Sequence, residues 1–519
     1  DFTVTGTLTS AMQTTGSHFA IVPSGVRSIH VGGNFSAENQ VGVNNYTFGN
    51  NNLTIWLDGA GDQSITQGAS GNNFLYSNIR VDKTSGEVSL LSNLTLSYSS
   101  GNNLVIQEGI FSLNGWDLSV TPGTITVESG GLFKRQGGET STVPILQAGS
   151  KIVYSGDGDA APDSFSVLSA GFMYQDLVID SIDGTMDAFS TSGNLDVNGT
   201  FRLQNGAFIQ GAADNVNIAG NVIIDTGTVY TKSSGSGVLT FDGDLTFADN
   251  TSPQQDLGRL VIGSSPDTTT LTTDLTATSL LIDTGDALIT DGYEVTIAGT
   301  VDINGTLDAS SGTDGNSTIT VGGLWDMTGG VFTNTNSTVI FDGTMGAGTY
   351  DIISDTKSFN NLTISDTGSD AVWVLNDNLV VTNDIFVVAG TLDLAGFDAT
   401  VTDQFDVDAG LRLHGDETVT AATFTIDSST SSVQFYNGAV TATITNYAQV
   451  FHNLILGAGK THEIATGVGN GITINGTLDS NGSSGSPSVL RSVADAGVDW
   501  ELNLQGVSNL QDKVDVKRS

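Results

Sequence analysis

Short runs of alternating apolar and polar residues follow one another along the whole chain. Leu392 and Leu394, and again Phe405 and Val407, put two apolar side chains on the same side of a short run. Alternation with a period of two is typical of a β-strand that buries one face. Gly, Asn and Asp separate the runs, as in the Asn-Gly-Thr turn at 475–477, and these residues tolerate turn backbone at low cost. The pattern predicts a chain built almost entirely of short strands.

One sequence motif recurs five times. It consists of an aromatic residue, a polar residue, Asn or Asp, Leu or Ile, any residue, and Ile, Val or Leu. Its copies are 76–81 (YSNIRV), 174–179 (YQDLVI), a weaker 257–262 (LGRLVI), 359–364 (FNNLTI) and 451–456 (FHNLIL). A period of about 90 residues indicates an internal repeat.

Two further motifs precede the first in a fixed order. A strand ending in an aromatic residue and a Gly turn lies before each copy, and a Gly-Gly motif lies further upstream before several. The clearest examples are 340–343 (IFDG) and 321–325 (VGGLW). We therefore divide the chain into an N-terminal cap with the first coils, four repeat modules, and a last module with closing coils. These segments are 1–75, 76–173, 174–256, 257–358, 359–450 and 451–519.

The fold class that fits this pattern best is an all-β parallel β-helix, or β-solenoid, of about five supermodules of ~90 residues. A strand of about four residues cannot hold a sheet alone, but coils of about 20 to 25 residues can pair each strand with its counterpart one coil later. The alternative is a string of tandem Ig-like β-sandwiches, because one sandwich also takes about 90 residues. Scarce proline (7 residues) and turn motifs that recur inside a module favour the solenoid.

Charge excludes several classes of partner. The 16 Lys and Arg against 56 Asp and Glu give a net charge of −40. Such a chain repels nucleic acid and anionic membrane surfaces. It contains no cysteine, so disulfides and thiolate metal sites are excluded. No apolar run reaches the ~18 residues of a membrane span, and the strand-like start at Asp1 is what we expect of a protein processed after export.

The segment 157–163 (DGDAAPD) places three carboxylates in one loop: Asp157, Asp159 and Asp163. Calcium prefers flexible cages of oxygen ligands of this kind. The loop lacks the complete EF-hand pattern, so an acidic turn without a bound ion is the alternative interpretation. Calcium is the one cofactor that the sequence suggests.

Nothing in the sequence predicts catalysis, and we expect no enzyme. The nearest approach to an acid–base cluster is 414–417 (HGDE), for which a polar turn is the simpler interpretation. His452 and His462 lack the spacing of a zinc site. Of the five tryptophans (Trp56, Trp116, Trp325, Trp373 and Trp500), Trp56 and Trp325 fall on repeat motifs and are predicted to pack in the core.

The order of three elements carries a resemblance. They are G-x-G-x-Q-x-I, clearest at 59–65, F-x-N-L-x-I at 359–364 and G-T-L-x-L at 390–394. This order resembles the repeat of bacterial secreted surface proteins of parallel β-helix type, akin to filamentous-haemagglutinin-like adhesins. The stretches 482–492 and 498–502 are similar to a closing coil of such proteins. The resemblance implies an extracellular or cell-surface location and a structural or adhesive role.

We therefore expect a non-enzymatic extracellular β-solenoid that serves as a stalk, an adhesin or a filament subunit. Its partners would be other copies, joined head to tail, or host and matrix glycans. The residues expected to mediate self-association are Phe2, Val4, Leu8, Trp500 and Leu502. The alternative is a carbohydrate-binding or polysaccharide-degrading β-helix protein.

Overall fold

The computed structural model describes most of the chain. The described residues are 2–12, 23–39, 46–50, 52–68, 73–75, 77–97, 103–264, 266–310, 312–368, 370–426, 428–436, 441–444, 450–464, 471–481, 488–492, 501–509 and 514–517.

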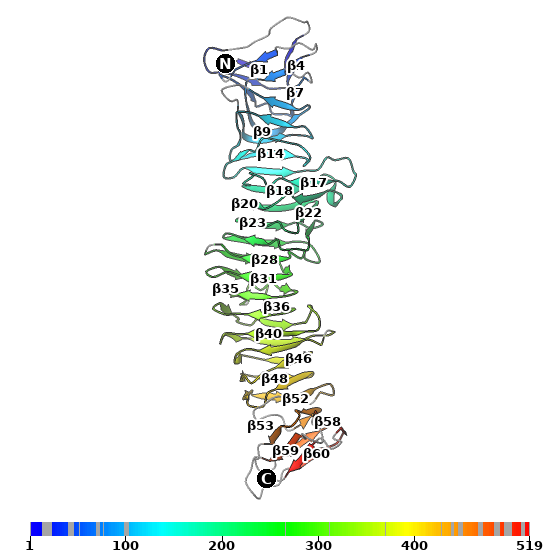
Figure 1. Ribbon diagram of the computed structural model, residues 1–519. Helices are drawn as coiled ribbons and strands as arrows, with labels where there is room; N and C mark the ends of the chain where they lie inside the picture. The colour runs from blue at the N-terminus through cyan, green and yellow to red at the C-terminus, as the bar shows by residue number, and fades with distance from the viewer. Residues whose placement is uncertain are drawn as a thin grey trace. The chain divides into compact units, whose positions relative to one another are not determined.

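The protein is an all-β parallel β-helix, which confirms the predicted fold class. Throughout the described ranges the strands pair in parallel (Figure 1), and the helical content is one 3-10 turn, Gly184–Met186. Tandem Ig-like sandwiches, which consist of antiparallel sheets, are the wrong alternative. The chain forms two compact units, Asp1–Gly258 and Arg259–Ser519.

In the first unit one strand of each turn joins a continuous parallel ladder. Its strands are β3 (Arg27–Val31), β6 (Leu53–Leu57), β9 (Asn78–Leu90), β11 (Leu104–Ser112), β14 (Gly131–Arg135), β16 (Lys151–Tyr154), β18 (Asp176–Asp180), β21 (Phe201–Asn205), β24 (Val222–Ile224) and β27 (Leu245–Asp249). A second face carries β17 (Ser164–Val167), β19 (Ala188–Thr191), β22 (Ala207–Gln210) and β25 (Val229–Lys232). A third face carries β20 (Leu195–Val197), β23 (Val216–Ile218) and β26 (Leu239–Phe241).

The second unit repeats this construction. One of its ladders contains β28 (Arg259–Ile262), β31 (Ser279–Ile282), β34 (Val301–Ile303), β37 (Trp325–Asp326), β40 (Thr349–Ile353), β43 (Val372–Leu375), β46 (Thr391–Asp393), β49 (Gly410–Leu413), β52 (Ser432–Phe435), β55 (Asn453–Leu456), β58 (Thr477–Ser480) and β61 (Val507–Asn509). Another contains β30 (Leu275–Ala277), β33 (Val295–Ile297), β36 (Thr318–Val321), β39 (Thr338–Phe341), β42 (Asn361–Ser365), β45 (Ile385–Ala389), β48 (Gln404–Val407) and β51 (Thr423–Thr425).

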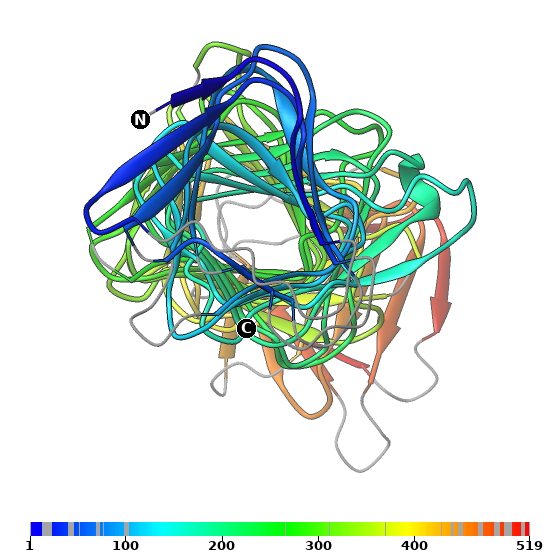
Figure 2. The ribbon, with the colours of Figure 1, turned by 90° about the horizontal axis from the view of Figure 1, so that it is seen from above.

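The length of a coil agrees with the sequence. Leu177 pairs with Phe201 in the first unit, and Ile385 pairs with Phe405 in the second. These pairs lie 24 and 20 positions apart, within the expected 20 to 25 residues. Within each unit the backbone winds in successive turns around one interior (Figure 2). Because the register is preserved from turn to turn, inward apolar side chains stack on one another, as Leu362, Ile385 and Phe405 do.

The third position of the recurring motif has a structural reason. In three copies its Asn or Asp side chain accepts a hydrogen bond from a backbone N–H of the following turn, whereas Asn361 accepts from the side chain of Asn383 (2.7 Å). The bonds run from Asn103 N–H to Asn78 (2.9 Å), from Thr200 N–H to Asp176 (2.9 Å) and from Thr477 N–H to Asn453 (3.0 Å). Such bonds satisfy backbone donors at strand ends that would otherwise lack a partner.

The same device recurs at other turn positions and forms short ladders. Asp398 donates its backbone N–H to Asn378 (3.0 Å), and its carboxylate accepts from the N–H of Thr418 (2.6 Å). Aspartate is therefore a building unit of the turns, which accounts for part of the acidic composition.

The five copies of the motif do not share one face, because in the second unit β28 and β55 lie in one ladder and β42 lies in the other. The module boundaries stay a prediction.

The part of the chain that the structure describes contains no helix that is long and apolar enough to cross a bilayer.

Candidate functional site

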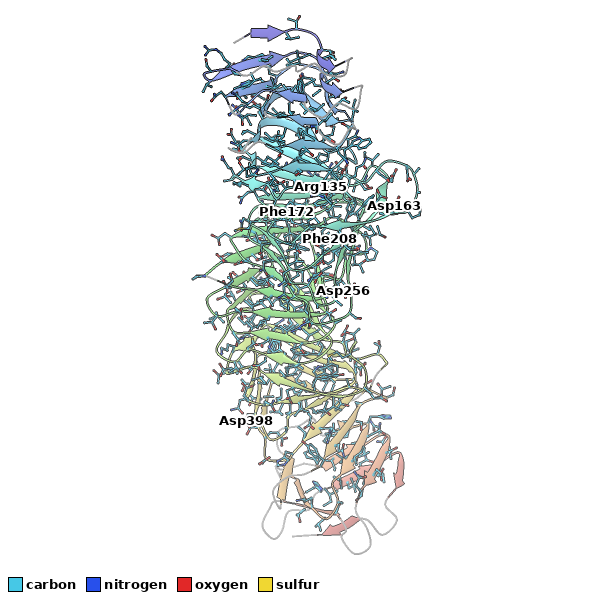
Figure 3. The ribbon with its side chains drawn as sticks, turned by 45° about the horizontal axis from the view of Figure 1, so that its top comes forward. Arg135, Asp163, Phe172, Phe208, Asp256 and Asp398 are labelled. Carbon is cyan, nitrogen blue, oxygen red and sulfur yellow. The ribbon has the colours of Figure 1, made fainter. Side chains whose placement is uncertain are left out.

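The predicted calcium loop lies between β16 and β17 and stands out from the body of the first unit, where Asp163 is labelled in Figure 3. One carboxylate oxygen from each of Asp157, Asp159 and Asp163 lies within 4.8 Å of the other two. The structure therefore brings together the three side chains that the sequence grouped. Asp157 and Asp159 are exposed, and Asp163 is half-buried.

A second group of carboxylates shares Asp157. Asp183 and Asp187, which flank the 3-10 turn Gly184–Met186, come within the same 4.8 Å limit of Asp157 and of each other. Asp183 and Asp187 lie outside the loop 157–163, so the local pattern of acidic residues did not predict them. A coil of 20 to 25 residues places 183–187 beside 157–163, so the repeat length was the signal that could have found them.

Backbone hydrogen bonds fix the two segments against each other. Ile182 N–H donates to the Ser155 carbonyl (2.9 Å), and Ala188 N–H donates to the Asp163 carbonyl (2.9 Å). At Gly156 the backbone has a positive φ of 66°, and a Cβ at this position would lie 1.9 Å from Oδ2 of Asp187. Glycine is therefore required there, because any side chain would collide with the buried carboxylate.

The side chains of this acidic cluster have few partners. Oδ2 of Asp187, a fully buried residue, accepts a hydrogen bond from Ser181 Oγ (2.8 Å), whereas its Oδ1 has no partner. Asp183 accepts from Ala160 N–H through Oδ1 (3.2 Å), and its buried Oδ2 has none. In the described ranges no ion pair includes Asp157, Asp183 or Asp187. The negative charges of the cluster therefore face one another without a cationic side chain.

Burial and mutual repulsion both oppose ionisation in this cluster. Burial raises the pKa of Asp187, and the carboxylates of Asp183 and Asp157 raise it further. The pKa of Asp163 is also raised, by desolvation and by the neighbouring Asp157, Asp159 and Asp183. Removal of water and of counter-charge has this effect on any carboxyl group. The arrangement favours whatever supplies positive charge to it.

A polar group of a different kind lies in the interior behind the loop. Arg135 is fully buried and donates to Ser141 Oγ (3.2 Å) and to the Glu139 carbonyl. Its guanidinium lies over the rings of Tyr154 (5.5 Å) and Phe172 (6.0 Å). Figure 3 shows Arg135 and Phe172 on the body of the unit. The sequence analysis did not predict this buried cation.

The residues predicted for self-association lie in several terminal strands. Val4 in β1 (Phe2–Val4) and Leu8 in β2 (Leu8–Met12) are half-buried, as is Leu502 in β60 (Glu501–Leu504). The side chain of Phe2 and all of Trp500 lie outside the described residues. Strand β1 pairs in parallel with β3, and β2 pairs in parallel with β4 (Phe35–Asn39). In the described residues each of these pairings uses one edge of the terminal strand.

The predictions for tryptophan are confirmed in part. Trp325 is fully buried, as predicted, and Trp373, for which no position was predicted, is fully buried as well. The prediction that Trp56 packs in the core is wrong. Its side chain points away from the interior that Ile55 and Leu57 of β6 face. Its ring is sandwiched between His30 (centroids 5.3 Å apart) and the guanidinium of Arg80 (4.9 Å). Trp116 is exposed.

The segment 414–417 is a turn held by its own side chains. The Glu417 carboxylate accepts the backbone N–H groups of His414 and Gly415, and His414 Nδ1 lies 3.0 Å from Asp416. The carboxylate that would have to act as an acid or base is thus engaged with the backbone. His462 faces the interior of its unit, and neither of its ring nitrogens has a partner.

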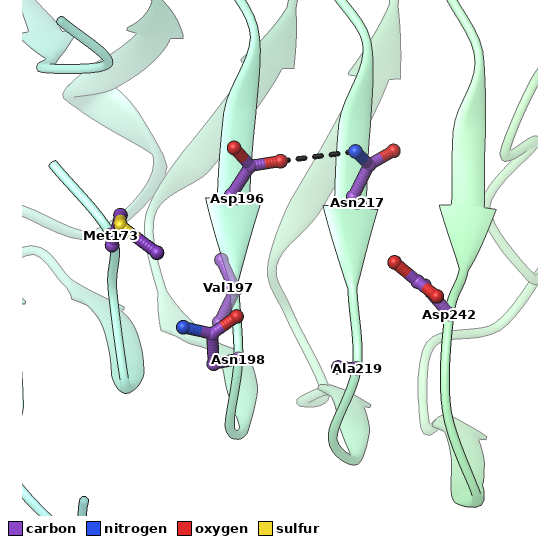
Figure 4. A pocket seen from close by; sticks show the side chains of 7 residues that line it. All are labelled: Met173, Asp196, Val197, Asn198, Asn217, Ala219 and Asp242. Atoms are coloured by element: carbon purple, nitrogen blue, oxygen red, sulfur yellow. Dashed lines mark hydrogen bonds between the residues drawn. The ribbon is translucent and has the colours of Figure 1, made fainter. Parts of the chain in front are cut away.

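A small depression on the first unit is lined by Met173, Asp196, Val197, Asn198, Asn217, Ala219 and Asp242 (Figure 4). Its volume is about 210 Å³, below the ~300 Å³ at which small-molecule pockets begin. Asn217 Nδ2 donates to Asp196 across it (3.0 Å). The acidic cluster is therefore the stronger candidate site.

Neither the protein-family models nor the curated proteins nor the solved structures contain a match to this chain. What is established is a parallel β-solenoid. No family is assigned. The resemblance to secreted adhesin repeats stays a prediction.

Proposed function

We propose that the protein is a non-enzymatic structural β-solenoid of an extracellular surface, which joins other copies end to end. The observation that supports this proposal is the preserved register. Leu177 pairs with Phe201, and Phe201 pairs with Val222, so three successive turns place equivalent residues over one another. A strand from another copy, with the same alternation, would continue such a ladder.

The chemistry of a strand edge favours this mode of association. An edge offers backbone N–H and C=O groups to any strand that meets it in register. In β1, Phe2, Thr3 and Val4 pair with Ile29, His30 and Val31 along one edge. A head-to-tail contact through the opposite edge does not close on itself, and such contacts produce filaments.

Charge favours end-to-end over side-by-side contact. At a net charge of −40, two copies that align along their length bring many like charges together. An end contact brings few. The repulsion extends over about 8 Å at physiological salt, so lateral association is opposed while the terminal strands remain able to pair.

Electron microscopy of the purified protein at low and high concentration tests the proposal. We expect single particles when dilute and uniform fibres when concentrated. The double variant Val4→Lys, Leu8→Lys should abolish the fibres, because charge on an edge strand opposes pairing. Val388→Lys adds charge at an exposed position of β45 and should leave the fibres intact.

Two results would contradict the proposal. One is a wild-type protein that stays single at every concentration, and the other is fibres that persist in the double variant. The first result would favour the alternative, a carbohydrate-binding module. The observation that supports this alternative is the exposed indole of Trp116, a side chain suited to stacking on a sugar ring.

A further inference from the structure

We propose that Asp157, Asp183 and Asp187 bind a calcium ion that joins the projecting loop 155–163 to the following turn. This ligand set differs from the single-loop set Asp157, Asp159 and Asp163 that the sequence suggested. It is independent of end-to-end assembly, because all three residues lie within one turn and the next of the first unit.

The buried carboxylate of Asp187 carries the argument. The residue is fully buried, and Ser181 Oγ satisfies only its Oδ2. Its Oδ1 has no hydrogen-bond partner. One carboxylate oxygen of Asp187 lies within 4.8 Å of an oxygen of Asp157 and an oxygen of Asp183. A buried carboxylate with one oxygen left without a hydrogen bond is unfavourable unless a counter-charge or a proton compensates it. The sequence has a glycine at 156, whose Cα hydrogens leave room for this carboxylate.

A cation accounts for the whole group better than a proton does. One proton would neutralise one carboxyl group and leave the others to repel each other. Asp183 has a second buried oxygen without a partner, Oδ2. A divalent ion between the three side chains would compensate Asp157, Asp183 and Asp187 together.

The type of ligand selects the ion. All three donors are carboxylate oxygens, whereas zinc prefers imidazole and thiolate. Calcium accepts six to eight oxygens in variable geometry, while magnesium demands a near-ideal octahedron. Asp159 and Asp163, which converge with Asp157 within the loop, add oxygens close by. Calcium is therefore expected to bind more tightly than magnesium.

Such an ion would act as a cross-link between turns. The loop and the 3-10 turn are already joined at two points by the backbone bonds Ile182 to Ser155 and Ala188 to Asp163. Three carboxylates between these points oppose the contact. Calcium would convert this repulsion into attraction, so that the carboxylates add to the two backbone hydrogen bonds in holding the projecting loop against the following turn.

Isothermal titration calorimetry of the chelator-treated full-length protein with calcium chloride, and separately with magnesium chloride, tests the proposal. We expect one saturable calcium site and at least tenfold weaker magnesium binding. Asp187→Asn keeps the size of the side chain and removes its charge, and it should weaken calcium binding at least tenfold. Asp157→Asn should do the same, and because Asp157 is exposed this variant does not threaten folding.

A matched control exists in the second unit. Asp302 pairs in register with Asp326, and burial together with Asp326 raises the pKa of its carboxyl group. It belongs to no group of three converging carboxylates in the described ranges. Asp302→Asn removes one such charge and should leave calcium binding unchanged.

Three outcomes would overturn the assignment. The first is the absence of saturable calcium binding. The second is wild-type affinity in both Asp187→Asn and Asp157→Asn. The third is a double variant Asp159→Asn, Asp163→Asn that loses calcium binding while Asp187→Asn retains it. This result would place the ion in the loop alone.

Discussion

Two interiors of this solenoid are filled in opposite ways. Around β37 to β43 in the second unit, aromatic rings fill the interior: Trp325 lies 5.7 Å from Phe359, and Phe341 lies 5.9 Å from Trp373. Around β14 to β18 in the first unit, a buried guanidinium lies against aromatic rings instead. The aromatic interior of the second unit depends on how completely side chains fill its volume. The interior of the first unit depends on hydrogen-bond partners for its buried polar groups.

In the first unit, hydrogen bonds from two buried tyrosines hold the segment that follows β17. Tyr154 and Tyr174 share a hydrogen bond (2.8 Å) deep in the interior. Tyr174 donates to the carbonyl of Leu168 (2.6 Å), and Tyr154 accepts from the N–H of the same residue (3.0 Å). The two phenols thus bind both backbone polar groups of Leu168, the residue that follows β17. A buried polar network whose members all have hydrogen-bond partners makes the segments that it joins more rigid.

The largest effect should come from removing volume in the aromatic interior. Trp373→Ala should lower the free energy of unfolding by about 3–5 kcal/mol, because it leaves a cavity among Phe341 and Tyr350. Trp373→Phe should cost much less, since Nε1 of Trp373 has no hydrogen-bond partner to lose. Urea denaturation of both variants gives the comparison. Equal costs for the two variants would show that volume does not govern this interior.

The next effect comes from His462, a buried base whose ring nitrogens have no hydrogen-bond partner. His462 in β56 (Thr461–Ile464) is buried against Phe435, and burial lowers its pKa to about 4. Between pH 6.5 and 4 the unfolded chain therefore binds a proton that the folded chain does not. Stability that is complete above pH 6.5 should fall by about 3 kcal/mol as the pH approaches 4.

The variant His462→Leu isolates this contribution from the many carboxyl groups that titrate in the same range. Its loss of stability between pH 7 and pH 4.5 should be smaller than that of the wild-type protein by about 2–3 kcal/mol. The measurement is the midpoint of urea denaturation at the two pH values. The same pH dependence in both proteins would mean that the pKa of His462 is the same in the folded and the unfolded chain.

The sequence predicted the fold because alternation and repeat length are local signals. The same rule of alternation explains one wrong prediction and one buried residue for which no prediction was made. In β6, Ile55 and Leu57 face inward, so Trp56 must face outward, although its motif position suggested the core. In β14, Gly131 and Phe133 face inward, and the period of two carries Arg135 inward with them. The pleat of the strand, and not the charge of the residue, determines the direction of the Arg135 side chain.

The candidate site was predictable only in part. Asp157, Asp159 and Asp163 stand close together in the sequence, so their proximity followed from one loop. Asp183 and Asp187 meet Asp157 only because the next turn lies beside it. Whether a side chain has a hydrogen-bond partner, as Oδ1 of Asp187 does not, depends on packing between turns, and no local pattern of residues specifies that.

The smallest effect tests the partner-dependent interior directly. Tyr174→Phe should destabilise the protein by about 1–3 kcal/mol, because it leaves the Leu168 carbonyl and the Tyr154 hydroxyl without their buried partner. Tyr350→Phe removes a half-buried hydroxyl that donates to Gly346 (2.9 Å), and it should cost less because water can replace that bond. The double variant Tyr154→Phe, Tyr174→Phe should cost less than the sum of its single variants, since the two phenols share one hydrogen bond. If the effects of the two single variants on the free energy of unfolding add strictly in urea denaturation, the two phenols contribute independently. The hydrogen bond between them would then not couple their support of Leu168 after β17.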